Sequence, residues 1–249
     1  MKISNILISQ PAPQTSNPYT DLITKHKVNI DFLPFFKVEP LNAKEFRAQK
    51  INILDFTAIV FTAKTTIDAF FKLCEELRIT VPETMKYFCN SEATAVYLQK
   101  HIVFRKRKIF YGNGTTASII DTIGSKHKDE KFLIAATADN LKGDLHKLFS
   151  KTKFKFESAA FVKTIYSDLK EIDLSKYQIA VFYSPSDVKS LLENFPEFQQ
   201  NGLQIATFGP AAAKAVTAAG LNADITAPTP EAPSIAKALM LHLQKENKK

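Results

Sequence analysis

The sequence has no tryptophan, only two cysteines and no long apolar run, and these shortages exclude several classes of protein. Cys74 and Cys89 are too few for the disulfide framework of a small secreted domain. No apolar run reaches the roughly 20 residues that a membrane-spanning helix needs. The opening MKISN leads straight into a strand pattern, without the apolar segment and cleavage site of a signal peptide. We therefore expect a cytoplasmic protein with reduced thiols, whose core is filled by its 20 phenylalanines.

The common catalytic and cofactor motifs are missing as well. The chain has no glycine-rich GxGxxG motif after a strand, no P-loop and no GxSxG nucleophile elbow. Its five histidines lack the spacing of metal ligands. We interpret Cys89, at a strand end, as a buried small residue and Gly112-Asn113-Gly114 as a plain tight turn. The sequence thus predicts neither a metal nor a cofactor.

The net charge of +8 favours polyanionic partners, which include nucleic acids, anionic membranes and multiply charged metabolites. Part of the excess is local, in Arg105-Lys106-Arg107-Lys108 and in Lys245, Lys248 and Lys249. Each run is interpreted as a solvated face or tail. No aromatic residues interleave with the basic run, as they do in base-stacking grooves. We therefore expect no nucleic-acid and no membrane partner.

The chain repeats itself at long range. Asn5–Ser9 falls on Lys131–Ala135 when the sequence is shifted, and Tyr87–Ser91 falls on Ile205–Gly209 with a slightly smaller shift. The shrinking offset is what small deletions in one copy would produce. A period of about 120 residues exceeds the roughly 20 to 50 residues of solenoid repeats. The sequence therefore predicts two similar domains.

Short apolar strands alternate with helices along both copies. This alternation is typical of a mostly parallel sheet covered by helices on both faces. The strands are expected at residues 3–8, 28–33, 58–62, 86–89, 108–111, 132–136, 153–158, 179–183, 203–207 and 223–226. Residues 18–25 are expected to form the first helix, with Asn17 as its N-cap. Thr229-Pro230-Glu231 is expected to open the last helix, over 231–245.

Ligands of such sheets bind beyond the carboxyl ends of the strands. Three of the loops there are rich in small and hydroxyl residues: Thr62-Ala63-Lys64-Thr65, Ser184-Pro185-Ser186 and Phe208-Gly209-Pro210-Ala211. Small residues let backbone amides approach a ligand closely, and the helix N-termini behind them favour negative charge. An ordinary loop–helix junction has a similar composition, so both interpretations stay open at this point.

These loops also carry a family resemblance. Ile179–Ser186 resembles the "FxSPS" segment of uroporphyrinogen-III synthases, and Ile205–Ala213 is similar to their "AxIGPxTA" segment. Gly220-Leu221 matches a "GL" turn, and Thr229-Pro230 matches the "TP" before the last helix. Weaker similarities occur at Pro18-Tyr19, Val60-Phe61-Thr62 and Asn140-Leu141-Lys142. The resemblance spans nearly the whole chain.

The resemblance implies an α/β fold of two similar doubly wound, flavodoxin-like domains with parallel sheets, joined by a two-stranded β linker. It also implies a crossed connectivity, in which the strand at 3–8 pairs with the one at 179–183. One domain would comprise residues 1–36 plus 166–249 and the other 50–158. The linkers would be 37–49 and 159–165.

The implied activity is a cyclising hydro-lyase reaction of haem biosynthesis. Hydroxymethylbilane, a linear tetrapyrrole, would close to uroporphyrinogen III with inversion of ring D. The family needs no cofactor, and we expect a monomer with only transient contact to the enzyme that supplies the bilane. Positioning and electrostatics would perform such catalysis. The residues expected to bind substrate are Thr62, Ala63, Lys64, Ser91, Thr94, Asn140, Lys142, Ser184, Ser186, Gly209 and Ala212.

The chain departs from the family pattern at three positions. Val162 stands where the family has the tyrosine of its "VYxT" segment, and Tyr166 is the candidate catalytic replacement. Ala212 stands in place of a threonine, and Lys64 in place of a proline. These changes motivate an alternative, a catalytically impaired protein of the same fold that binds a tetrapyrrole or another polyanion. A periplasmic-type two-domain receptor is disfavoured because no signal peptide is found.

Overall fold

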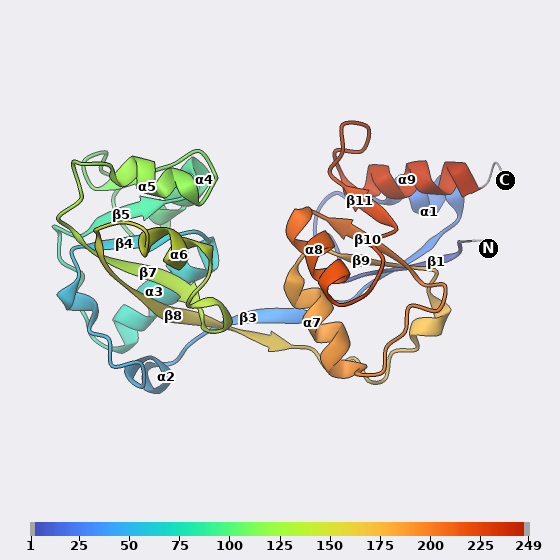
Figure 1. Cartoon of the computed structure of the whole chain (residues 1–249), viewed down its shortest axis with the longest axis horizontal. Helices are drawn as coiled ribbons and strands as arrows, with labels where there is room; N and C mark the ends of the chain where they lie inside the picture. Colours follow the sequence, from blue (N-terminus) through green and yellow to red (C-terminus); the bar gives the residue numbers. More distant parts are fainter. Residues whose placement is uncertain (1–2, 247–249) are drawn as a thin grey trace. The chain divides into compact units, whose positions relative to one another are not determined.

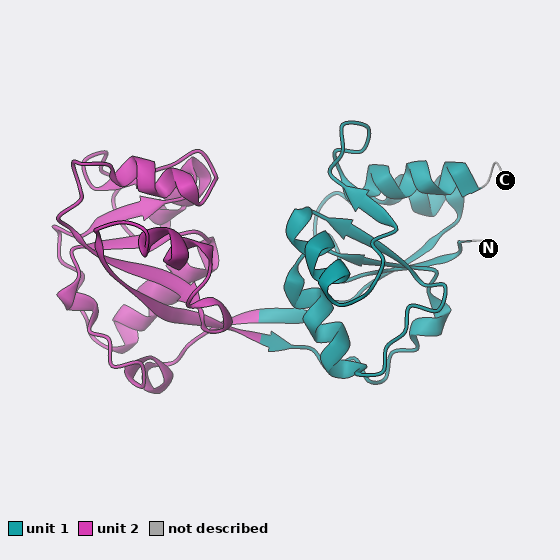
Figure 2. Cartoon of the chain, in the orientation of Figure 1, with its two compact units in different colours: residues 1–37, 165–249 teal, residues 38–164 magenta. Residues whose placement is uncertain are grey.

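Short runs of buried aliphatic and aromatic residues form the strands of two α/β units (Figure 1). The structure is a computed structural model that describes residues 3–246. The chain divides into Met1–Lys37 with Ile165–Lys249 as unit 1, and Val38–Thr164 as unit 2 (Figure 2). Two doubly wound units with parallel sheets are what the sequence predicts. Within residues 3–246, no helix combines the length and the apolarity needed to cross a membrane.

Unit 1 contains a five-stranded parallel sheet in the order β11-β10-β9-β1-β2. Its strands are β1 (Asn5–Ile8), β2 (Asn29–Phe32), β9 (Ile179–Phe182), β10 (Gln204–Phe208) and β11 (Ile225–Ala227). β1 pairs with β9, with Leu7 opposite Ala180, so the two ends of the chain share one sheet. The predicted pairing of these strands is confirmed.

The helices of unit 1 cover both faces of its sheet. One face packs against α7 (Pro185–Asn194) and α8 (Pro210–Ala218). The other packs against α1 (Thr20–His26) and α9 (Ile235–Glu246). Each face has its own cluster of buried residues, because both faces of the parallel sheet are apolar.

Unit 2 contains a six-stranded sheet in the order β3-β8-β7-β4-β5-β6. Its strands are β3 (Phe36–Pro40), β4 (Ala58–Phe61), β5 (Lys86–Cys89), β6 (Ile109–Tyr111), β7 (Lys131–Thr137) and β8 (Lys155–Tyr166). The pairings among β4 to β8 are all parallel. One face is covered by α2 (Ala43–Arg47), α3 (Lys64–Glu76) and α4 (Glu92–Tyr97), and the other by α5 (Ala117–Ile123) and α6 (Asp144–Phe149).

Phenylalanines fill the core of unit 2, as the composition predicts. The Phe70 ring lies 5.6 Å from the rings of both Phe61 and Phe161, and Phe161 lies 5.1 Å from Phe46. All four side chains are buried. Tilted and edge-on aromatic pairs of this kind add to the free energy of area burial.

β3 and β8 carry the chain between the units, and they hydrogen-bond to each other at both ends. Leu41 N donates to Phe161 O and Ser167 N donates to Phe35 O, each at 2.9 Å. The predicted linker 37–49 contains α2, which begins at an Asn42–Glu45 capping box and places Phe46 in the core of unit 2. The predicted linker 159–165 is the continuation of β8.

Two predicted helix starts are wrong by a few residues. The first helix begins at Thr20, since Asn17 Oδ1 accepts from Tyr19 N and forms a turn before the helix. The last helix begins at Ile235, not at Glu231. Thr229 and Ala232 hydrogen-bond to each other in a turn, and Pro233 disfavours helical backbone at the residue before it.

Candidate functional site

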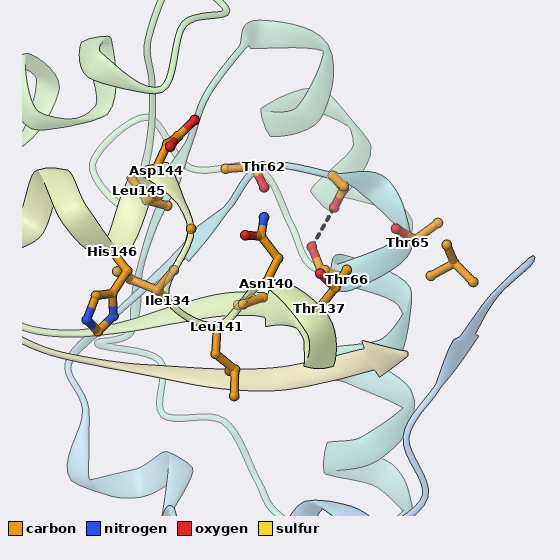
Figure 3. A pocket seen from close by; sticks show the side chains of 15 residues that line it. Thr62, Thr65, Thr66, Ile134, Thr137, Asn140, Leu141, Asp144, Leu145 and His146 are labelled. Atoms are coloured by element: carbon orange, nitrogen blue, oxygen red, sulfur yellow. Dashed lines mark hydrogen bonds between the residues drawn. The ribbon is translucent and has the colours of Figure 1, made fainter. Parts of the chain in front are cut away.

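A pocket opens in unit 2 at the carboxyl ends of β4 and β7, with a cavity volume of about 160 Å³ (Figure 3). β4 ends at the buried Phe61, and the chain then turns through Thr62 and Ala63 into α3. β7 ends at Thr137, after an irregularity in its pairing with β8, and leads to Asn140. The fold therefore brings together three residues predicted to bind substrate: Thr62, Ala63 and Asn140.

The Asn140 carboxamide lies in the middle of this pocket, between Thr62 and Thr137 (Figure 3). Gly143 makes this placement possible, because a Cβ there would overlap Asn140 Oδ1. Among residues 3–246, the side chains of Asn140, Thr62 and Thr137 have no hydrogen-bond partner. One amide and two hydroxyl groups are therefore available to a ligand.

The N-terminus of α3 borders the same pocket through Ala63, Thr65 and Thr66. This helix has 13 residues, its N-cap Ala63 forms no side-chain cap, and its first turn has no acidic residue. Thr66 Oγ1 donates back to Ala63 O at 2.8 Å and so leaves the first amides uncovered. The positive end of the helix dipole therefore favours an anionic group in the pocket.

The predicted substrate-binding residues leave out several residues of the pocket, among them Thr66, Thr137, Asp144 and His146. His146 Nδ1 lies 2.9 Å from Ser158 Oγ, which turns its ring toward β8 (Figure 3). Thr137 is the last residue of β7, and Thr62 directly follows β4, so the rule that ligands bind at carboxyl strand ends applies to both. Nothing in the local sequence indicates His146, because only the packing of α6 against β8 brings it there.

Four other predicted residues of unit 2 lie outside this pocket. Ser91 Oγ accepts from Thr94 N at 3.3 Å and lies 3.1 Å from Thr94 Oγ1, so both residues cap α4. Lys142 is exposed and does not line the cavity. Lys64 is exposed too, and its ammonium lies 5.2 Å from the centre of the Tyr97 ring.

Next to Lys64, a charged network connects α3 with the segment after α4. Asp68 accepts from Tyr97 Oη at 2.6 Å and from Lys100 Nζ at 3.0 Å, and it lies 2.7 Å from His101 Nε2. Burial raises the pKa of Asp68, but these hydrogen bonds outweigh it and hold the pKa at about 2. The network keeps Asp68 ionised and fixes the position of Lys100.

Asp68 also lines a second cavity of unit 2, of about 180 Å³, together with Thr65, Lys72 and Val162. Val162 stands at the position of the family tyrosine and is 1% exposed, within the core cluster of the unit. A larger side chain at this position would have space toward Thr65.

In unit 1, the loop after β9 is held by a buried carboxylate. Asp187 Oδ2 accepts from Tyr183 N at 2.9 Å and from Ser184 N at 2.8 Å, which fixes the predicted site residue Ser184. Burial raises the pKa of Asp187, and these hydrogen bonds and the nearby Ser9 hydroxyl oppose the rise. Asp187 Oδ1, Ser9 Oγ and Thr207 Oγ1 are buried and form no hydrogen bond of normal geometry within residues 3–246.

Two tyrosines meet beside this loop. Tyr19 Oη and Tyr183 Oη are 2.5 Å apart, and burial raises the pKa of both phenols. Their rings contact the ends of two strands of the sheet, Tyr19 against Phe32 of β2 and Tyr183 against Phe208 of β10. The carboxyl edge of this sheet therefore has an aromatic lining with neutral hydroxyl groups.

The remaining predicted residues of unit 1 differ in exposure. Gly209 has φ 92 and ψ 152, a backbone conformation that is essentially restricted to glycine, while a Cβ there would meet open space. Its conformation, and not close approach, explains the glycine. Ser186 is partly exposed, whereas Ala212 is fully buried and its methyl group cannot contact a ligand.

Tyr166, the predicted catalytic residue, ends β8 within unit 1. Its Oη is buried and has no hydrogen-bond partner in the part of the chain that the structure describes. Lys189 Nζ lies 5.2 Å from the centre of its ring. The hydroxyl is thus not exposed to a ligand in this conformation.

The thiols and the candidate turn behave as predicted. Burial raises the pKa of Cys74 and of Cys89 to about 12, so neither thiol is a nucleophile near neutral pH. At Gly112 a Cβ would overlap Ser118 Oγ, and the same hydroxyl accepts from Asn113 N at 3.1 Å, as in a tight turn. Residues 3–246 contain no cluster of side chains suited to a metal ion.

These features define a class: two-unit α/β proteins with polar, helix-backed loops at the carboxyl edges of parallel sheets. The sequence model of the family described as uroporphyrinogen-III synthase HemD matches residues 17–237, and the chain belongs to this family. No curated protein matches the chain in sequence.

Two solved structures show the same fold. One is a mutant uroporphyrinogen III synthase from the extremely thermophilic bacterium Thermus thermophilus, with 13% identity, a TM-score of 0.64 and coverage of 99% of this chain and 100% of that one. The other is the uroporphyrinogen-III synthetase from Helicobacter pylori, with 18% identity, a TM-score of 0.57 and coverage of 98% and 100%.

Proposed function

We propose that this protein is an active uroporphyrinogen-III synthase that closes hydroxymethylbilane to uroporphyrinogen III with inversion of ring D. The pocket at the carboxyl ends of β4 and β7 carries the proposal, because it joins an unpartnered amide, hydroxyl groups and a helix N-terminus. The proposal includes a cytoplasmic monomer that needs no metal or cofactor and meets the enzyme that supplies the bilane only transiently.

The pocket suits one part of this substrate. Its volume of about 160 Å³ is below the roughly 300–1,000 Å³ of sites for drug-sized ligands, so it would hold one substituted pyrrole ring. A carboxylate of that ring would accept hydrogen bonds from the first amides of α3. Asn140 Nδ2 and the Thr62 hydroxyl would donate to the same group or to a second one.

The proposed chemistry needs positioning more than covalent catalysis. The substrate loses its hydroxyl group as water, and the resulting cation is attacked by ring D at a substituted carbon. The spiro intermediate then fragments and closes to the type III product. Fixed donors around the carboxylates would hold the chain in the conformation that favours this attack. In unit 1, the loop held by Asp187 would contribute Ser184 and Ser186 as further contacts, and the turn between β10 and α8 would contribute Gly209.

Incubation with freshly generated hydroxymethylbilane, followed by separation of type I and type III products, tests the proposal. The unmodified protein is expected to yield type III. T62V is expected to lower the rate of type III formation severalfold, and T80V, at an exposed loop threonine of the same unit, is the matched control. Type I product alone from the unmodified protein would refute the synthase activity.

The alternative is a protein of this fold that binds a tetrapyrrole without cyclising it. One observation favours it: Val162 is buried, and the Tyr166 hydroxyl is not exposed, so neither position presents a phenol to a ligand. Two results together would identify this alternative. The protein would bind uroporphyrin, as measured by quenching of the porphyrin fluorescence, and incubation with hydroxymethylbilane would yield type I product alone.

A further inference from the structure

The amino edge of the unit 2 sheet is lined with lysines. β5, β7 and β8 begin with Lys86, Lys131 and Lys155, and Lys108 immediately precedes β6. Lys131 and Lys155 are direct partners in the register of two neighbouring strands. Like charges in such positions repel each other and destabilise the sheet. Packing of the strands therefore does not explain this row.

The same edge of unit 1 shows that the fold does not require lysines. β1, β2 and β10 begin with Asn5, Asn29 and Gln204, and Gln178 precedes β9. These amides bond within the edge: Asn29 Nδ2 donates to Asn5 Oδ1 at 3.1 Å, and Gln178 Oε1 accepts from Asn5 N at 2.9 Å. At the strand starts themselves, unit 1 therefore has neutral amides where unit 2 has lysines.

Loops before the strands of unit 2 extend the positive charge. Lys86 pairs with Glu130, and Arg105 and Lys108 lie 3.4 and 3.8 Å from Glu83. Six further exposed cations at this edge have no ion pair with any residue in 3–246: Lys106, Arg107, Lys128, Lys131, Lys153 and Lys155. Their charge is available to an external anion.

A cavity of about 230 Å³ opens at the β5–β6 end of this edge. Its walls include Met85, Tyr87 and Ile102, and its rim includes Arg105 and Lys108 together with their ion-pair partner Glu83. Val103, also at the cavity, is 77% exposed. This apolar hollow, next to the exposed Lys106 and Arg107, has room for one apolar side chain flanked by carboxylates.

We propose that the amino edge of unit 2 is a docking surface for an acidic protein segment, which inserts one apolar side chain into the cavity beside Val103. The cavity favours a protein over a nucleic acid, because the described residues show no exposed aromatic ring at this edge for base stacking. The surface lies at the end of the strands opposite to the candidate pocket, so a docked partner leaves that pocket open. The inference does not depend on the proposed enzymatic activity.

Binding of synthetic peptides to the full chain tests the surface. The probes are a polyglutamate peptide with one central leucine, the same peptide with alanine in that place, and oligothymidylate of equal charge. Fluorescence anisotropy across a salt series should show the leucine peptide as the tightest ligand, with affinity falling as salt rises. K131Q/K155Q should weaken it by about five- to tenfold, and V103S should remove the preference for leucine.

K170Q/K237Q, at exposed lysines of unit 1, is the charge-matched control and should bind like the parent. Circular dichroism verifies folding, which K131Q/K155Q should retain because it removes a repulsion. The proposal is overturned if the leucine peptide does not bind or is not preferred to alanine. It is equally overturned if the control loses as much affinity, or if oligothymidylate binds more tightly than the peptide.

Discussion

The Asn140 side chain is positioned by a residue that no ligand needs to touch. Because a Cβ on Gly143 would overlap Asn140 Oδ1, G143A should displace the carboxamide from the pocket. We expect N140A and G143A to lower type III formation by similar factors, roughly tenfold, and the double variant to be no worse than either. Initial rates of product formation measure this double-mutant cycle.

N222A, at an exposed asparagine of unit 1, is the control for loss of an amide and should keep the parent rate. Additive losses in the double variant would mean that Gly143 serves the backbone of the turn and not the Asn140 side chain.

Asp187 makes a prediction about pH and stability. Its pKa is raised by burial, so the folded state binds the proton more tightly than the unfolded state does. The resulting stabilisation is present below the unfolded-state pKa of about 3.9 and is lost as the pH rises through the raised folded pKa. D187N stays neutral and can still accept from Tyr183 N and Ser184 N, while its NH2 group can donate to Ser9 or Thr207 Oγ.

Urea unfolding between pH 4 and 8 measures the free energy of unfolding. Above the folded-state pKa of Asp187, D187N should be at least as stable as the parent, and its stability should lack the pH dependence that Asp187 causes. D187A removes the acceptor and should be less stable at every pH. If D187N were as unstable as D187A at pH 7, the loop would require the negative charge itself.

Val162 offers a gain-of-function test. V162Y extends into the cavity of about 180 Å³ and places a phenol near Thr65, at the position where the family has its tyrosine. Overpacking typically costs about 1–3 kcal/mol, and the existing cavity should keep the cost at the lower end. We expect a larger share of type III product than in V162I, which adds volume without a hydroxyl group. Equal product ratios in the two variants would show that the missing tyrosine does not limit the activity.

At the residue scale, the predicted substrate contacts include Thr62, Ala63 and Asn140, which lie together at the carboxyl ends of β4 and β7. They also include Ser91 and Thr94, which cap a helix, because hydroxyl residues serve caps and ligands with the same chemistry. Whether a hydroxyl residue serves a ligand depends on which strand ends border the same cavity, and the sequence does not show this.

Among the elements, β7 and β8 combine a good strand pairing with an unfavourable pair of charges. Lys131 and Lys155 are register partners, and like charges opposite each other cost roughly 0.2–1 kcal/mol. K155E replaces this repulsion with an attraction, so the free energy of unfolding should rise by about 1 kcal/mol. Urea unfolding at low and high salt measures it, and the gain should shrink with salt.

K153E, which changes the charge just before β8, is the control and should gain less. An equal gain would assign the effect to the net charge of the unit and not to the paired lysines.

The elements themselves were largely predictable, because buried strands of this sheet type are short apolar runs. Their boundaries were less so. The predicted start of α9 at Glu231 is wrong, because Pro233 disfavours helical backbone before it. This effect outweighs the N-cap pattern of Thr229-Pro230-Glu231. α2 was missed because a five-residue helix has too few residues to show a periodicity, although its capping box is visible in the sequence.

For the whole molecule, the internal repeat predicts two domains but not which segments build each. A purely sequential interpretation would place all neighbours of β1 in the first half of the chain, whereas β1 lies between β2 and β9. Only the family resemblance implied this crossing. Long-range strand pairing leaves no periodic trace in one sequence, so residue patterns alone could not supply it.

The crossing leads to a prediction about unfolding. Each of the four clusters of buried residues lies within one unit, so a core substitution should destabilise that unit first. L239A removes a buried side chain of unit 1 and F70A one of unit 2, and each should cost about 2–5 kcal/mol.

Hydrogen exchange locates the effect. L239A should speed exchange in both Asn5–Ile8 and Ile179–Phe182, although these strands are far apart in sequence, and should spare Ala58–Phe61. F70A should do the reverse. Faster exchange in Asn5–Ile8 and Ala58–Phe61 together in either variant would contradict separate units, because it would mean that the whole chain opens at once.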